Sequence, residues 1–227
     1  MNVSDALRNA LRVLAVAGAV TLGAGVGTAM EAVPQGAAAV AACDAVAAHP
    51  DDPDKVGPGH VKAQIDLPAA IGLCRTAAAA DPGNLRVRYQ LARMLFYSGE
   101  REESLQAMKS AADDGYRQAQ FVYGVFINYQ RDGAPKDLCL TEAYWQKSAL
   151  AGRQAARVNY VRERLNGRFK GCKNMASVPQ MQQILTAAAS DATNYYESLF
   201  IKDLTARLEA GASSDAATKK PGSEPVW

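Results

Sequence analysis

The stretch SAADDGYRQAQFVYG, at positions 110–124, recurs in outline as SALAGRQAARVNYV at positions 148–161. Alanine, glycine and tyrosine residues of the two stretches match at a fixed offset of 37 positions. A period of this length predicts one helix pair per repeat, because such a pair buries its apolar face only by stacking on its neighbour. The alternative is an alanine-rich helix bundle in which the matches are accidental. The matched pairs are Ala112 with Ala149, Gly115 with Gly152, Ala119 with Ala156, and Tyr123 with Tyr160.

The composition of the 227-residue chain favours an all-α fold. Alanine, which has the highest helix propensity, is abundant, whereas β-branched and aromatic residues are sparse. No alternating run of strand length occurs in the sequence. The formal net charge of +2 gives no electrostatic reason to expect nucleic acid as a partner. Helices are expected over 37–48, 66–80, 85–97, 101–113, 117–129, 136–151, 153–166, 178–190 and 192–210.

The N-terminus has the three-part pattern of a secretory signal. Arg8 and Arg12 precede an uncharged, weakly hydrophobic run at 13–30, and small-residue sites follow this run. An uncleaved membrane anchor is the alternative, because an apolar run of this length is just able to span a bilayer. We therefore expect an exported, periplasmic protein, or one anchored in the inner membrane. The expected segments are a signal at 1–38, capping helices at 39–82, repeats with a C-terminal capping helix at 83–210, and a disordered tail at 211–227.

Four cysteines fit an oxidising compartment and indicate two disulfide bonds. Three pairings are possible, and pairing of Cys43 with Cys74 and of Cys139 with Cys172 closes two loops of similar length. Each such loop stabilises a fold by about 3–4 kcal/mol in the chain-entropy model. As an alternative, the letters VAAC ending at Cys43 have the form of a bacterial lipid-attachment box. A zinc site is not favoured, since no Cys-x-x-Cys pair occurs.

The sequence AQFVYGVFINYQRDGAPKDLCLTEAYWQKSALAG, at positions 119–152, resembles a Sel-one-like repeat, a longer-looped branch of the tetratricopeptide superfamily. The preceding unit, LRVRYQLARMLFYSGEREESLQAMKSAADDGY, is similar to the shorter tetratricopeptide form. The resemblance implies a right-handed α-α solenoid of helix pairs that binds protein rather than catalysing a reaction. It also implies that the segment 43–74, tied by a disulfide, is an N-terminal element that precedes such repeats in exported bacterial proteins. The residues that carry the resemblance are Ala119, Gly124, Gly133, Lys136, Asp137, Ala143, Trp145, Lys147, Ala149 and Gly152.

In tetratricopeptide-like pairs the first helix of each pair lines a concave groove, and the resemblance therefore implies a partner-binding surface. Tyrosine and arginine, which interface hot spots favour, recur at the matching positions. The alternative is that these side chains pack against neighbouring helices. A basic run at 153–170 is compatible with acidic protein or anionic lipid as a partner, and the alternative is an ordinary solvated helix face. The predicted groove residues are Arg86, Tyr89, Arg93, Tyr97, Phe121, Asn128, Tyr129 and Arg162.

Both histidines, His49 and His60, lie in one loop, HPDDPDKVGPGH, together with several aspartates. A small metal-dependent hydrolase that uses these groups is one hypothesis. No nucleophile–base, zinc-protease or phosphate-binding motif accompanies them. We therefore expect solvated loop aspartates in a segment that caps the edge of the helical stack.

The function expected from these features is that of a non-catalytic scaffold or adaptor. It would bind a protein or peptide in the groove, without a cofactor, a metal or a small-molecule substrate. A regulator that inhibits an envelope enzyme or sensor is the second hypothesis, and the hydrolase that uses His49 and His60 is the third.

Overall fold

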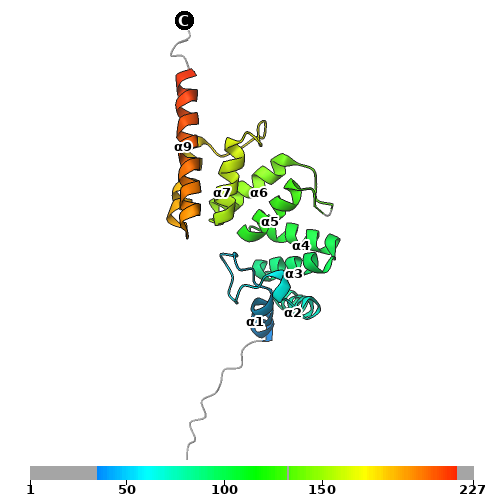
Figure 1. Cartoon of the computed structure of the whole chain (residues 1–227). Helices are drawn as coiled ribbons and strands as arrows, with labels where there is room; N and C mark the ends of the chain where they lie inside the picture. The colour runs from blue at the N-terminus through cyan, green and yellow to red at the C-terminus, as the bar shows by residue number, and fades with distance from the viewer. Residues whose placement is uncertain (1–34, 132, 219–227) are drawn as a thin grey trace, which may run out of the picture. The chain divides into compact units, whose positions relative to one another are not determined.

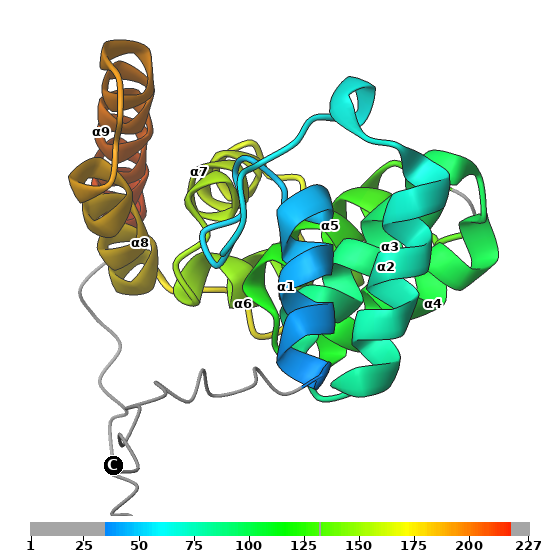
Figure 2. The ribbon, with the colours of Figure 1, turned by 90° about the horizontal axis from the view of Figure 1, so that it is seen from below.

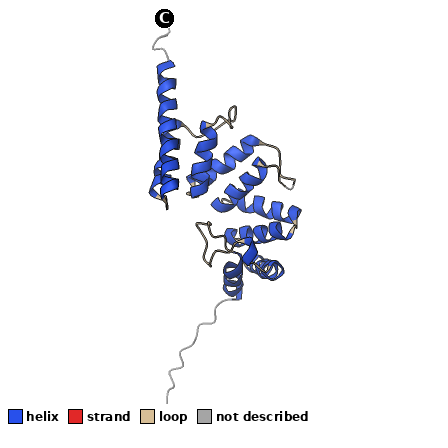
Figure 3. Cartoon of the chain, in the orientation of Figure 1, coloured by secondary structure: helices blue, strands red, loops and turns tan. Residues whose placement is uncertain are grey.

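The computed structural model describes residues 35–131 and 133–218, with side chains described as far as residue 211. The predicted signal, up to residue 34, and the end of the predicted tail, from residue 219, lie outside the described residues. Every regular element in the described part is helical (Figures 1 and 3), and no helix there is both long and apolar enough to cross a membrane. The elements are α1 (Gln35–Ala47), the short 3-10 helix η1 (Lys62–Gln64), α2 (Leu67–Ala80), α3 (Leu85–Ser98), α4 (Arg101–Asp113), α5 (Arg117–Asn128), α6 (Leu138–Leu150), α7 (Gln154–Leu165), α8 (Val178–Ser190) and α9 (Tyr195–Thr218).

These bounds confirm the all-α fold and lie close to the helices predicted from the sequence. The clearest difference is at the C-terminus, where α9 continues to Thr218, so that residues 211–218 of the predicted disordered tail are helical. At the other end, α1 begins at Gln35, within the segment predicted as a signal. The short helix η1 was not predicted, because three residues carry no periodic pattern.

Short polar side chains set where several of the described helices begin. An oxygen of the residue before the helix accepts a hydrogen bond from a backbone N–H of the first turn, which has no partner inside the helix. Asp66, Asn84, Asp137 and Ser177 act in this way at the starts of α2, α3, α6 and α8. At the other ends of α4 and α6, Gly115 and Gly152 have positive φ angles of 100° and 93°. The matched glycines are thus helix-ending residues, in a backbone conformation that glycine adopts without Cβ strain.

Each helix of the described part packs against the next one along the chain, as in a helical solenoid (Figures 1 and 2). The matched tyrosines Tyr123 and Tyr160 are both fully buried between helices. Helices α5 and α6 approach closely where the backbone of Gly124 lies against the indole of Trp145. A Cβ atom at position 124 would lie only 2.4 Å from Trp145 Cδ1. A small residue is therefore required at position 124, because α5 and α6 pack too closely there to leave room for a side chain.

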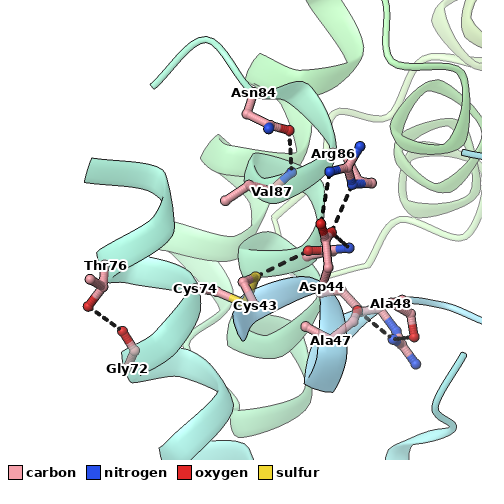
Figure 4. The surroundings of a disulfide bond; sticks show 12 residues. Cys43, Asp44, Ala47, Ala48, Gly72, Cys74, Thr76, Asn84, Arg86 and Val87 are labelled. Carbon is pink, nitrogen blue, oxygen red and sulfur yellow. Dashed lines mark hydrogen bonds and ion pairs between the residues drawn. A yellow bond between two sulfur atoms is a disulfide. The ribbon is translucent and has the colours of Figure 1, made fainter. Parts of the chain in front are cut away.

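Two disulfide bonds join neighbours in sequence, as predicted. Cys43–Cys74 connects α1 to α2 (Figure 4). Cys139–Cys172 connects the start of α6 to the segment after α7. Cys43 is fully buried, and its sulfur is in the disulfide, so it is not the acylated cysteine of the alternative interpretation. Disulfides of this kind are typical of proteins in an oxidising compartment.

The packing at Gly124 predicts the effect of adding a single methyl group. Gly124→Ala forces a Cβ into the indole of Trp145 and is expected to lower the free energy of unfolding by about 1–3 kcal/mol. Gly72→Ala is the matched control, because a Cβ at this helical glycine of α2 meets no atom within 4 Å. It is expected to raise stability by about 0.5–1 kcal/mol through helix propensity. Urea unfolding measured by circular dichroism checks both, and equal effects of the two changes would contradict the close α5–α6 contact.

Candidate binding site

The N-terminal loop, residues 48–60, lies against the helices that were predicted to form the groove. It leaves the end of α1 and returns through η1 to α2 (Figure 2). The guanidinium of Arg93, on α3, donates to the carbonyl oxygens of Ala47 and Ala48, both at 3.0 Å, and to that of His60. One buried side chain therefore holds both ends of the loop.

The aspartates of the N-terminal loop bind α5 and its N-terminal flank. The hydroxyl of Tyr116 donates to Asp52 at 2.7 Å, and Arg117 binds both carboxylate oxygens of Asp54 at 2.7 and 2.6 Å. Asp52 is fully buried, and this burial raises the pKa of its carboxyl above the ordinary value. The expectation of solvated aspartates is thus wrong for Asp52. The loop also does more than cap an edge, because it covers part of α3 and α5.

Three of the predicted groove residues make hydrogen bonds or ion pairs with other residues of the same chain. Arg86 forms a two-pronged ion pair with the buried Asp44 of α1, with both distances at 2.8 Å (Figure 4). Tyr89 is 1% exposed, and its hydroxyl accepts a hydrogen bond from the side chain of Gln118 at 3.1 Å. Arg93 is 4% exposed and bound to loop carbonyls. The prediction that Arg86, Tyr89 and Arg93 face a partner is therefore corrected, because their polar groups already have partners in the same chain.

Four other predicted residues meet in one open pocket of about 270 Å³, which we call the α5–α7 pocket. The pocket is bounded by α5, by the residue that follows α5, by α6, by α7 and by the segment after α7. The remaining predicted residue, Tyr97, lines a separate pocket of about 140 Å³ beside His49. The α5–α7 pocket is lined by Phe121, Val125, Asn128, Tyr129, Trp145, Asn159, Arg162, Glu163 and Arg168.

The walls of the α5–α7 pocket combine aromatic rings with arginines. The indole N–H of Trp145 donates to the carbonyl oxygen of Phe121 at 3.1 Å, and the two ring centres are 6.0 Å apart. Tyr129 is 63% exposed at the end of α5. Arg168 donates to the side-chain oxygen of Asn128 at 2.8 Å. Trp145 and Arg168 were missing from the predicted groove, although Arg168 belongs to the basic run that the sequence shows.

The two histidines make separate hydrogen bonds. Nδ1 of His49 accepts the backbone N–H of Asp51 at 3.0 Å, and Nε2 of His60 lies 2.9 Å from the carbonyl oxygen of Ala45. Burial, followed by the positive charge of Arg93, lowers the pKa of His49 from 6.5 to about 4. Among the described residues, no three His, Cys, Asp or Glu side chains are placed to hold a metal ion. The arrangement therefore gives no geometric support to the hydrolase hypothesis.

The described part is thus all-helical and repeat-like, with two disulfide bonds and an N-terminal loop bound to α3 and to the start of α5. The sequence matches no family model, and no curated protein matches it. Its function is therefore argued from its own residues.

The environment of His49 predicts a loss of stability in acid. The folded-state pKa of about 4 lies below the ordinary histidine value of 6.5, so the folded protein binds the proton more weakly than the unfolded chain. The stability from neutral His49 is full above pH 6.5 and is lost as the pH falls towards 4. We expect the free energy of unfolding to fall by about 1–3 kcal/mol over this window, and His49→Asn to remove this part of the fall.

The difference between wild type and His49→Asn isolates this effect, measured by urea unfolding at a series of pH values. Asp52 acts in the opposite direction, because its raised pKa gives stability in acid that is lost as the pH rises. His60→Asn is the matched control from the same loop. A pH dependence that persists in His49→Asn and disappears in His60→Asn would contradict the assignment.

Proposed function

We propose that the protein is a non-catalytic adaptor that binds another protein or a peptide at the α5–α7 pocket. One observation carries this proposal. The pocket gathers Phe121, Asn128, Tyr129 and Arg162, which the sequence assigned to the groove from two different repeats. Aromatic and arginine side chains of this kind contribute a large share of the free energy at protein interfaces.

The structure of the N-terminal loop supports peptide binding at the same face. Side chains of Arg93, Tyr116 and Arg117 bind backbone carbonyls and carboxylates of an irregular segment. The α5–α7 pocket continues from these groups along α5 and has no such segment from the described residues in it. A partner segment in the pocket would thus use chemistry that the chain already uses on itself.

The finer assignment, also a proposal, is a right-handed solenoid of tetratricopeptide and Sel-one-like repeats in an exported protein. It is supported by the residues that resemble these repeats, by the matched glycines that end α4 and α6, and by the two disulfide bonds. Export to a periplasm further needs the predicted signal. The alternative hypothesis is a regulator of an envelope enzyme or sensor. It would use the same pocket, but binding there would inhibit the partner, whereas in an adaptor binding assembles partners.

Site-specific crosslinking tests this function. A photoreactive phenylalanine analogue in place of Tyr129 is expected to capture a partner in a native envelope preparation. Arg162→Ala in the same chain is expected to lower the yield about tenfold, because it removes a side chain from the centre of the contact. Quantitative mass spectrometry of the captured proteins measures both results.

The matched control places the same analogue at Tyr196, a tyrosine of α9 that is 81% exposed and lies outside the pocket. The same partner captured at 196 but not at 129, with no effect of Arg162→Ala, would contradict binding at the α5–α7 pocket. It would move the site to the start of α9.

A further inference from the structure

A buried arginine beside the α5–α7 pocket has no carboxylate bound to it. Arg153, which precedes α7, is 8% exposed, and its Nε donates to the side-chain oxygen of Gln118. Its guanidinium carbon lies 5.4 Å from the centre of the Phe121 ring, one wall of the pocket. Asp51 and Asp52 act on it only across space, and within the described residues it forms no ion pair. A buried cation of this kind is costly unless it is compensated, and its charge adds to the positive potential beside Phe121.

The pocket itself has more positive than negative side chains. Arg162 binds Glu163 at 2.9 Å, while Arg168 binds Asn128 and lies 4.0 Å from the same Glu163. Two arginines therefore share one carboxylate. The side chains of Arg162 and Arg168 are 37% and 39% exposed, so both have N–H groups within reach of a ligand from solvent. Arginine binds carboxylates well because its planar N–H groups match the two oxygens.

The N-terminal loop supplies carboxylates to the groups at the start of α5. Its carboxylates Asp52 and Asp54 bind Tyr116 and Arg117 at the start of α5. Phe121 and Tyr129 lie further along the same helix and its C-terminal end, in the pocket. Donors for carboxylates at one end of α5 are thus followed by aromatic rings and arginines at the other. These groups are spread along the length of α5, so they suit an acidic peptide chain better than an isolated small anion.

We propose that the α5–α7 pocket takes an acidic segment of a partner protein, with a carboxylate at Arg162 and Arg168 and a neighbouring apolar side chain against Phe121 and Trp145. This inference rests on the proposed function and adds the chemical class of the partner. A pocket of about 270 Å³ has room for one or two side chains. A polyphosphate or a lipid headgroup supplies the charge but has no side chain for the aromatic wall.

Trp145 provides the measurement, because it lines the pocket and the chain has only two tryptophans. Trp227→Phe in the full chain leaves Trp145 as the sole reporter of fluorescence. The probe is acetyl-Glu-Asp-Phe-Glu-Asp-amide, and its matched control is the peptide acetyl-Gln-Asn-Phe-Gln-Asn-amide. We expect the acidic peptide to bind at least about tenfold more tightly, with an affinity that falls as salt is raised from 50 to 500 mM.

Variants test whether the pocket arginines give this preference. Arg162→Gln with Arg168→Gln is expected to weaken acidic-peptide binding about tenfold or more and to leave the amide peptide unchanged. Both side chains are partly exposed, and circular dichroism checks that the fold is kept. Arg75→Gln, which removes an exposed arginine of α2 bound to Glu100 and Glu103, is the matched control and should have no effect.

Equal affinity for the acidic and the amide peptide, or equal affinity for a short inorganic polyphosphate, would overturn the acidic-peptide proposal. So would a loss of binding in Arg75→Gln as large as that in the double variant. Absence of peptide binding together with crosslinking at position 129 would reject the acidic class and keep the proposed function. Absence of both would reject the two proposals together.

Discussion

The hydrogen bonds donated by the guanidinium of Arg93 are the interactions on which the N-terminal half depends. The guanidinium donates to three carbonyl oxygens, two at the start of the N-terminal loop and one at its end. A buried guanidinium needs several acceptors, and irregular backbone near a core needs donors, so each satisfies the other. The loop thereby has a fixed path across α3, and Asp52 and Asp54 are brought to Tyr116 and Arg117. The disulfide Cys43–Cys74 holds the helices from which the loop starts and to which it returns.

Most of the fold was predictable because its determinants are local. Capping residues such as Asp66 and Asn84, and the glycines that end α4 and α6, act within a few positions of the elements they limit. The 37-residue period then predicted helix stacking, and the even cysteine count predicted two disulfide bonds but left three pairings possible. The loop was misjudged because its partners are distant in sequence: Asp52 and Tyr116 are separated by 64 positions. A proline- and aspartate-rich segment is predicted to be solvated unless its distant partners are known.

The candidate site shows the same division between local and distant information. The repeat pattern assigned Phe121, Asn128, Tyr129 and Arg162 to the groove, and all four line one pocket. Phe121 and Asn128 do so together because residues on one helix face keep their spacing in any fold. The pattern placed Arg86, Tyr89 and Arg93 on the same surface but did not show that this surface is covered. It also missed Trp145 and Arg168, since Trp145 lies on α6, the second helix of its pair, and Arg168 lies beyond α7.

The size of the α5–α7 pocket limits how a partner is held. A stable protein interface buries about 800 Å² on each partner, far more than one or two side chains in about 270 Å³ supply. The N-terminal loop blocks extension over α3, because Arg93 and Tyr89 are already buried beneath it. A tight complex therefore needs contacts beyond the pocket in other directions, or displacement of the loop. Displacement would leave Arg93 and Asp52 without their partners. In the proposed adaptor, this cost would make the pocket the entry point and the loop the boundary of the binding surface.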